Sequence, residues 1–76
     1  MIVTFERIGR SHDVPPLTLD DALTGDETAA AIYTVARRHL MSRDVEVVVD
    51  GDRVHIFAGM HNGGGGTITR SAAQAD

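Results

Sequence analysis

The stretch Asp44–Gly59, DVEVVVDGDRVHIFAG, decides the fold because it predicts a β-hairpin. Apolar residues occupy every second position on both sides of a central turn, which is the period of strands with one buried face. These residues are Val45, Val47 and Val49, followed by Val54, Ile56 and Ala58. Asp50-Gly51 suits a type I′ turn, and Gly51-Asp52 is the alternative, which shifts the register by two residues without exchanging the faces. We expect strands at Asp44–Asp50 and Arg53–Gly59.

A helix is predicted directly before the hairpin, over Asp26–Ser42. Thr24 and Glu27 have the spacing of a capping box at its start. Its apolar stripe follows a period of 3.6 residues and consists of Ala29, Tyr33, Ala36 and Leu40, with Ile32 beside them. Because Ala29 and Ala36 are small, the helix backbone can approach a sheet closely.

The flanking segments complete one domain. We expect a strand at Met1–Ile8, a connector at Gly9–Thr18, a single turn at Leu19–Leu23, a glycine-rich loop at Met60–Gly66, a short strand at Thr67–Arg70 and a flexible tail at Ser71–Asp76. Pro15 and Pro16 keep the connector extended. The prediction is an α+β domain over residues 1–70, with one helix on one face of a three- or four-stranded mixed or antiparallel sheet.

One helix cannot cover both faces of this sheet. The hairpin alternation places Val48, His55 and Phe57 on the face away from the helix. The first strand adds either Ile2 with Ile8 or Val3 with Phe5 to that face. An uncovered apolar face marks an interaction surface, so Val48, Phe57 and His55 are the candidate interface residues.

Composition limits the remaining possibilities. The 76 residues have a mass of 8.1 kDa, a net charge of −4 and no cysteine. The lack of cysteine excludes disulfides and thiolate zinc sites, so a chain this short is expected to gain stability from a partner, such as a second copy of itself. The mild negative charge disfavours general binding of nucleic acid. Apolar runs are too short to cross a membrane, and charged residues lie where a signal peptide would be apolar, so we expect a cytoplasmic protein.

No motif for catalysis, a metal or a cofactor is apparent. Ser11, His12 and Asp13 are triad residue types, but neighbours in an extended segment cannot converge on one reacting atom. The four histidines lack a recognised metal-ligand spacing. The run HNGGGGT at His61–Thr67 lacks the lysine and the following helix of a phosphate-binding loop. We expect neither an enzyme nor a bound cofactor or metal.

A candidate anion site follows from the expected chain direction. The helix C-terminus and the glycine-rich loop are predicted at the same end of the domain, and Arg7 and Arg10 at the opposite end, beside acidic residues. The residues of this candidate site are Arg37, Arg38, Arg43, His61, Gly63 and Gly64. Guanidinium groups there would bind an acidic partner group or a phosphate.

Two functions are therefore compatible with the sequence. The first is a non-enzymatic protein-interaction module that forms a homodimer through the uncovered apolar sheet face or an edge strand. The second is an accessory factor that binds nucleic acid or a phosphate-bearing ligand through the arginine and histidine cluster, with nucleic acid the less favoured partner.

Overall fold

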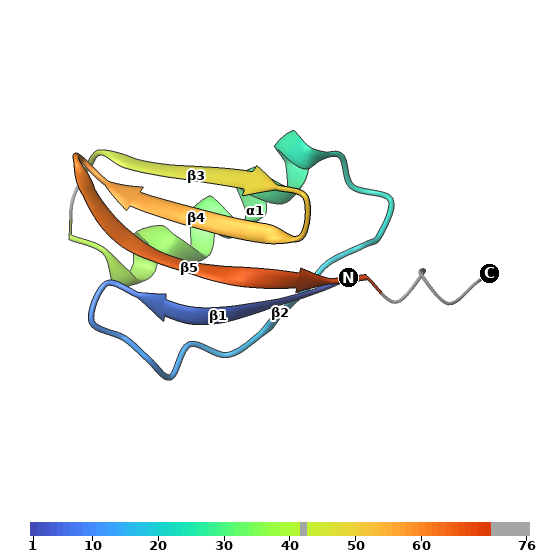
Figure 1. Cartoon of the computed structure of the whole chain (residues 1–76), viewed down its shortest axis with the longest axis horizontal. Coiled ribbons are helices and arrows are strands. Elements are labelled where there is room, and N and C mark those ends of the chain that lie inside the picture. Colours follow the sequence, from blue (N-terminus) through green and yellow to red (C-terminus); the bar gives the residue numbers. More distant parts are fainter. Residues whose placement is uncertain (42, 71–76) are drawn as a thin grey trace.

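The predicted hairpin forms one side of a curled antiparallel sheet in the computed structural model, which describes residues 1–41 and 43–70 (Figure 1). The elements are β1 (Ile2–Ile8), β2 (Leu17–Thr18), α1 (Gly25–His39), β3 (Val45–Asp50), β4 (Arg53–Ala58) and β5 (His61–Thr69). The strand order is β2-β1-β5-β4-β3, and every neighbouring pair is antiparallel. The α+β prediction is confirmed, with five strands instead of three or four. Ser42 and the expected tail, residues 71–76, lie outside the described residues.

The turn between β3 and β4 uses the alternative register. Asp50 pairs with Arg53, so the two-residue loop is Gly51-Asp52. Gly51 has a φ of 62°, and every described non-glycine residue has a negative φ. A positive φ at the first loop position alone is the pattern of a type II′ turn.

The glycine run forms a central strand, so the predicted loop at Met60–Gly66 is wrong. β5 lies between β1 and β4, and all four glycines belong to it. Glycine has a low strand propensity, which is why sequence reasoning placed a loop here. Close strand approach overrides that propensity, because a Cβ on Gly64 or Gly66 would overlap the backbone of β1, and one on Gly65 would crowd the Val54 carbonyl oxygen of β4.

The core lies between α1 and one face of the sheet. Its buried side chains are Met1, Val3, Phe5, Ile8, Val14, Ile32, Ala36, Val54, Ile56 and Ile68. Gly66 pairs with Phe5 on one side and with Val54 on the other, and larger side chains fill the core around it. The helix-facing valines of β3 are only partly buried against this core.

A β-bulge changes the face of the last residues of β1. The β1–β5 register shifts between Phe5 and Arg7, which makes Glu6 the additional residue. As a result Ile2 is 45 % exposed on the face away from α1, whereas Ile8 is fully buried. The expectation that Ile2 and Ile8 share the uncovered face is therefore wrong, and so is its alternative, because Val3 and Phe5 lie in the core.

The helix begins as predicted. The Thr24 Oγ1 accepts a hydrogen bond from the Glu27 N–H at 3.1 Å, and Glu27 Oε1 accepts one from the Thr24 N–H at 2.9 Å, so the capping box is present. The helix ends at His39, earlier than predicted, and Leu40 has an extended backbone.

The single turn expected at Leu19–Leu23 does not span that range. Thr18, directly before it, belongs to β2 and pairs with Ile2 of β1. A turn forms instead at residues 21–22. The Met1 amino group donates a hydrogen bond to the Leu19 carbonyl oxygen at 2.6 Å and forms an ion pair with Asp21. These contacts attach the segment before α1 to the start of β1.

Candidate functional site

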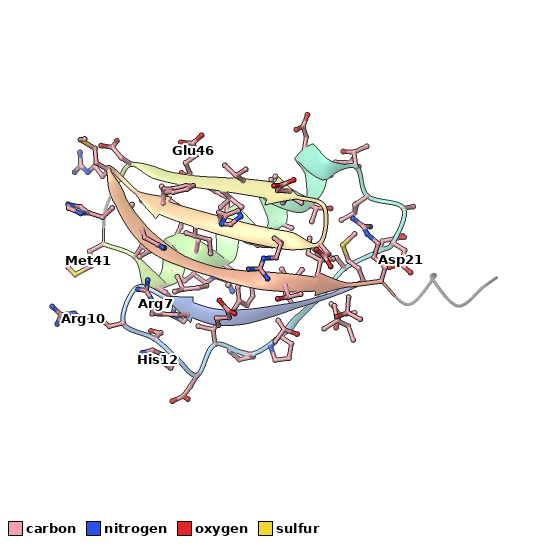
Figure 2. All side chains as sticks on the ribbon, viewed as in Figure 1. Arg7, Arg10, His12, Asp21, Met41 and Glu46 are labelled. Atoms are coloured by element: carbon pink, nitrogen blue, oxygen red, sulfur yellow. The ribbon has the colours of Figure 1, made fainter. Side chains whose placement is uncertain are left out.

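Five of the seven arginines lie at one end of the molecule. β1 and α1 run in the same direction (Figure 1), and Gly9, directly after β1, lies against His39 and Leu40 at the end of α1. The five are Arg7, Arg10, Arg37, Arg38 and Arg43. Figure 2 shows Arg7, Arg10 and Met41 at this end and Asp21 at the other.

The predicted separation of Arg7 and Arg10 from the other arginines is therefore wrong. The connector after β1 returns along the sheet as β2, antiparallel to β1, before α1 begins. This return segment reverses the direction that sequence reasoning assigned to the helix. It also removes the expected pairing of Arg7 and Arg10 with the acidic residues before α1.

The residues of the predicted anion site are divided between the helix and the sheet. Arg37 and Arg38 are exposed in the last turn of α1, Arg43 is exposed before β3, and His61 is exposed at the start of β5. Gly63 and Gly64 lie within the sheet. The Gly63 carbonyl oxygen accepts from the Gly9 N–H at 2.7 Å, and the Gly64 N–H donates to Asn62 Oδ1 at 2.9 Å. The Gly64 N–H is therefore already hydrogen-bonded and is not a free donor for an anion.

β3 is an edge strand, with no further strand beside it among the described residues. The Gly59 N–H donates to the Asp44 carbonyl oxygen at 2.6 Å, continuing the β3–β4 ladder. Hydrogen-bonded pairs alternate along an antiparallel ladder, so the even-numbered residues of β3 are the ones bonded to β4. The backbone N–H and C=O groups of Val45, Val47 and Val49 therefore point to the open edge.

A groove of about 530 Å³ lies between this edge and α1. It is lined by Asp26, Ala29, Ala30, Tyr33, Thr34, Val45, Glu46 and Val47. Ala29 and Ala30 leave this space because their side chains are short, and the larger Tyr33 is 39 % exposed beside it. Sequence reasoning noted the small side chains of the helix but could not show that they leave a groove at the sheet edge.

The predicted interface residues lie on the sheet face away from α1. Val48 is 39 % and Phe57 37 % exposed, and His55 is the cross-strand partner of Val48. Glu46 pairs with Phe57, and Ile2 lies beyond β5 on β1. Val48 and Phe57 therefore form a small apolar pair beside the open edge, and polar side chains separate them from Ile2.

A second groove, of about 370 Å³, lies on the same face over the glycines of β5. It is lined by Glu6, Arg7, His12, Arg53, Val54, His55, Asn62, Gly64, Gly65 and Gly66. Sequence reasoning missed this groove because it exists only when β5 is a strand between β1 and β4. The alternation of Arg53 and His55 along β4 is the one signal in the sequence that both belong to one face.

No group of three metal-ligating side chains occurs among the described residues, and no helix among them is long and apolar enough to cross a membrane. Ser11 closes the turn after β1 through its backbone, which exchanges hydrogen bonds with Ile8 at 2.9 and 3.0 Å. The chain matches no protein-family model, no curated protein and no solved structure at a significant level.

Proposed function

We propose that the protein is a non-enzymatic interaction module that binds an extended segment of a partner protein along β3. The observation that carries this proposal is a regular edge strand with three half-buried, helix-facing valines, two of which, Val45 and Val47, line an open groove. An added strand would bond the outward backbone groups of Val45, Val47 and Val49. Alternate side chains of that strand would enter the groove beside Ala29 and Tyr33 and bury the valines further.

The charge of the edge supports a basic partner segment. On the face away from α1, the β3 row consists of Glu46, Val48 and Asp50, with Asp44 before it and Asp52 after it. A partner strand with lysine or arginine at alternate positions would place cations opposite these carboxylates. Opposite charges across a strand pair stabilise it by about 0.2–1 kcal/mol for each pair.

The same row disfavours a homodimer through this edge. A two-fold pairing of β3 with its own copy keeps even-numbered residues opposite even-numbered residues. Centred on Val47 it places Asp44 opposite Asp50, and centred on Val48 it places Glu46 opposite Asp50. Like charges directly opposite each other are destabilising, so the basic segment of another protein is the better occupant.

A peptide titration tests this proposal. The probe is an extended peptide of alternating lysine and valine, and its control has glutamate in place of lysine. We expect the lysine peptide to shift the amide resonances of β3 and of Tyr33, and the glutamate peptide to leave them in place. Glu46→Lys should weaken binding of the lysine peptide about threefold, whereas Asp13→Lys, a reversal at an exposed acid in the connector, should leave it unchanged.

Two results would overturn the proposal. If neither peptide shifts the β3 resonances at millimolar concentration, β3 does not accept a strand. If light scattering gives twice the 8.1 kDa mass and the β3 amides lose their protection from hydrogen exchange on dilution, a second copy occupies the edge. That result is the homodimer expected from the sequence. A cytoplasmic location remains part of the proposal and is tested by fractionating cells that express the tagged chain.

A further inference from the structure

The groove over the β5 glycines has a floor of bare backbone. Gly65 pairs with His55 of β4 on one side and with Arg7 of β1 on the other. The walls belong to strands that are separated only by β5, so they stand about 10 Å apart. Because the glycines of β5 have no side chains, β5 can approach its neighbours closely. The same absence leaves a channel between two rows of polar groups.

The walls carry two arginine side chains and one carboxylate. Arg7 is held in place because its Nη1 donates to the Gly9 carbonyl oxygen at 2.6 Å, which leaves its other N–H groups for a ligand. The guanidinium group of Arg53 forms no hydrogen bond or ion pair with any described residue. Glu6 reaches over the floor, with Oε1 4.0 Å from the position of a Cβ on Gly65.

This set of groups favours an anion that also carries hydrogen-bond donors. Guanidinium groups bind phosphate oxygens through charge-assisted hydrogen bonds, and His55 and His12 add further donors beside them. Glu6 can only accept hydrogen bonds when ionised, so it repels a bare anion and favours hydroxyl or amine donors next to the phosphate. The volume, about 370 Å³, is near the lower end of small-molecule sites.

We infer that this groove binds the phosphate ester of a small polar ring, such as a sugar phosphate, with Arg53 and Arg7 on the phosphate and Glu6 on the ring hydroxyls. The site lies on the sheet face away from α1 and is separate from the groove beside β3. The inference therefore goes beyond the proposed interaction with a protein segment, and either can fail without the other.

Amide chemical shifts test the inference with three probes, which are ribose 5-phosphate, inorganic phosphate and ribose. We expect ribose 5-phosphate to shift Gly64, Gly65, Gly66 and His55 at millimolar concentration and to bind more tightly than either fragment. Arg53→Ala should weaken it about tenfold, as expected for the loss of a hydrogen bond between charged groups. Arg38→Ala is the matched control, because it removes an exposed arginine of α1, and it should have no effect.

The Glu6→Gln variant distinguishes the contacts of the phosphate group from those of the sugar ring. It should strengthen binding of inorganic phosphate and weaken the preference for ribose 5-phosphate over it. Arg53→Lys keeps the charge and should recover part of the affinity, and the amide spectrum of each variant shows that it is folded.

The inference is overturned if no probe shifts the β5 glycines at millimolar concentration. It is also overturned if the shifts centre on α1 and disappear in Arg38→Ala, because the anion then binds at the helix end. Equal affinity for ribose 5-phosphate and inorganic phosphate in both the parent chain and Glu6→Gln would overturn the assigned ring contact.

Discussion

Gly64 in β5 lies so close to the carbonyl oxygen of Arg7 in β1 that a methyl group on Gly64 would overlap that oxygen. Gly64 also has a φ of 140°, a backbone conformation that residues with a side chain rarely adopt. This contact lies where the β1–β5 ladder ends, next to the bulge at Glu6. The glycine therefore helps to hold the central strand against β1 and shapes the floor of the groove above it.

Gly64→Ala should destabilise the protein by more than about 3 kcal/mol, because strained φ and backbone overlap add. Gly25→Ala is the matched control, since nothing lies within 4 Å of its Cβ position at the start of α1. That variant should be neutral or stabilising by up to about 1 kcal/mol. Urea denaturation of both variants measures the difference, and equal stabilities would contradict the close approach of β5 to β1.

Ile8→Ala should cost about 2–5 kcal/mol, because the β-bulge turns this residue into the core and the substitution leaves a cavity. Ile2→Ala should cost less than about 1 kcal/mol, since Ile2 is largely exposed. In a regular strand both side chains would share one face and the two costs would be similar. Thermal unfolding of the pair therefore tests the bulge at Glu6 directly.

Thr24→Ala should lower the free energy of unfolding by about 1 kcal/mol, because it removes the side-chain acceptor of the capping box. Thr34→Ala makes a suitable control. The Thr34 hydroxyl only donates a hydrogen bond to the Ala30 carbonyl oxygen of the same helix, at an exposed position. Its loss should therefore be neutral or slightly stabilising. Chemical denaturation monitored by circular dichroism compares the two, and similar losses would mean that the cap does not form in solution.

Amide hydrogen exchange along β3 should alternate in the free protein. Glu46, Val48 and Asp50 donate toward β4 and should exchange slowly, whereas Val45, Val47 and Val49 face the open edge and should exchange fast. Binding of an added strand should then protect the three valines selectively. Uniform protection of all six amides in dilute protein would show that the edge is already covered.

Much of the fold follows from signals within short stretches of chain. The alternating valines of β3 and the turn residues after them specify the hairpin, and Thr24 and Glu27 specify the helix start. These predictions succeeded because the interactions behind them join residues close in sequence. The candidate sites were harder to predict, since both grooves combine residues from separate elements.

The errors arise where distant segments meet. The Gly63–Gly66 run forms a strand because it pairs with both β1 and β4. Glycines have no side-chain pattern that would indicate such pairing. The gathering of Arg7 and Arg10 beside the end of α1 depends on the return through β2, which is only two residues long.

The amino-acid pattern alone is sufficient for the hairpin, the helix start, the α+β class and the acidic row of β3, because each rests on local geometry or on residue type. Tertiary packing decides the place of β5, the burial of Ile8, the gathering of the arginines and both grooves. The physical reason is that a bulge, a close strand approach and a chain reversal depend on contacts between residues far apart in sequence. No local preference of glycine or arginine encodes those contacts.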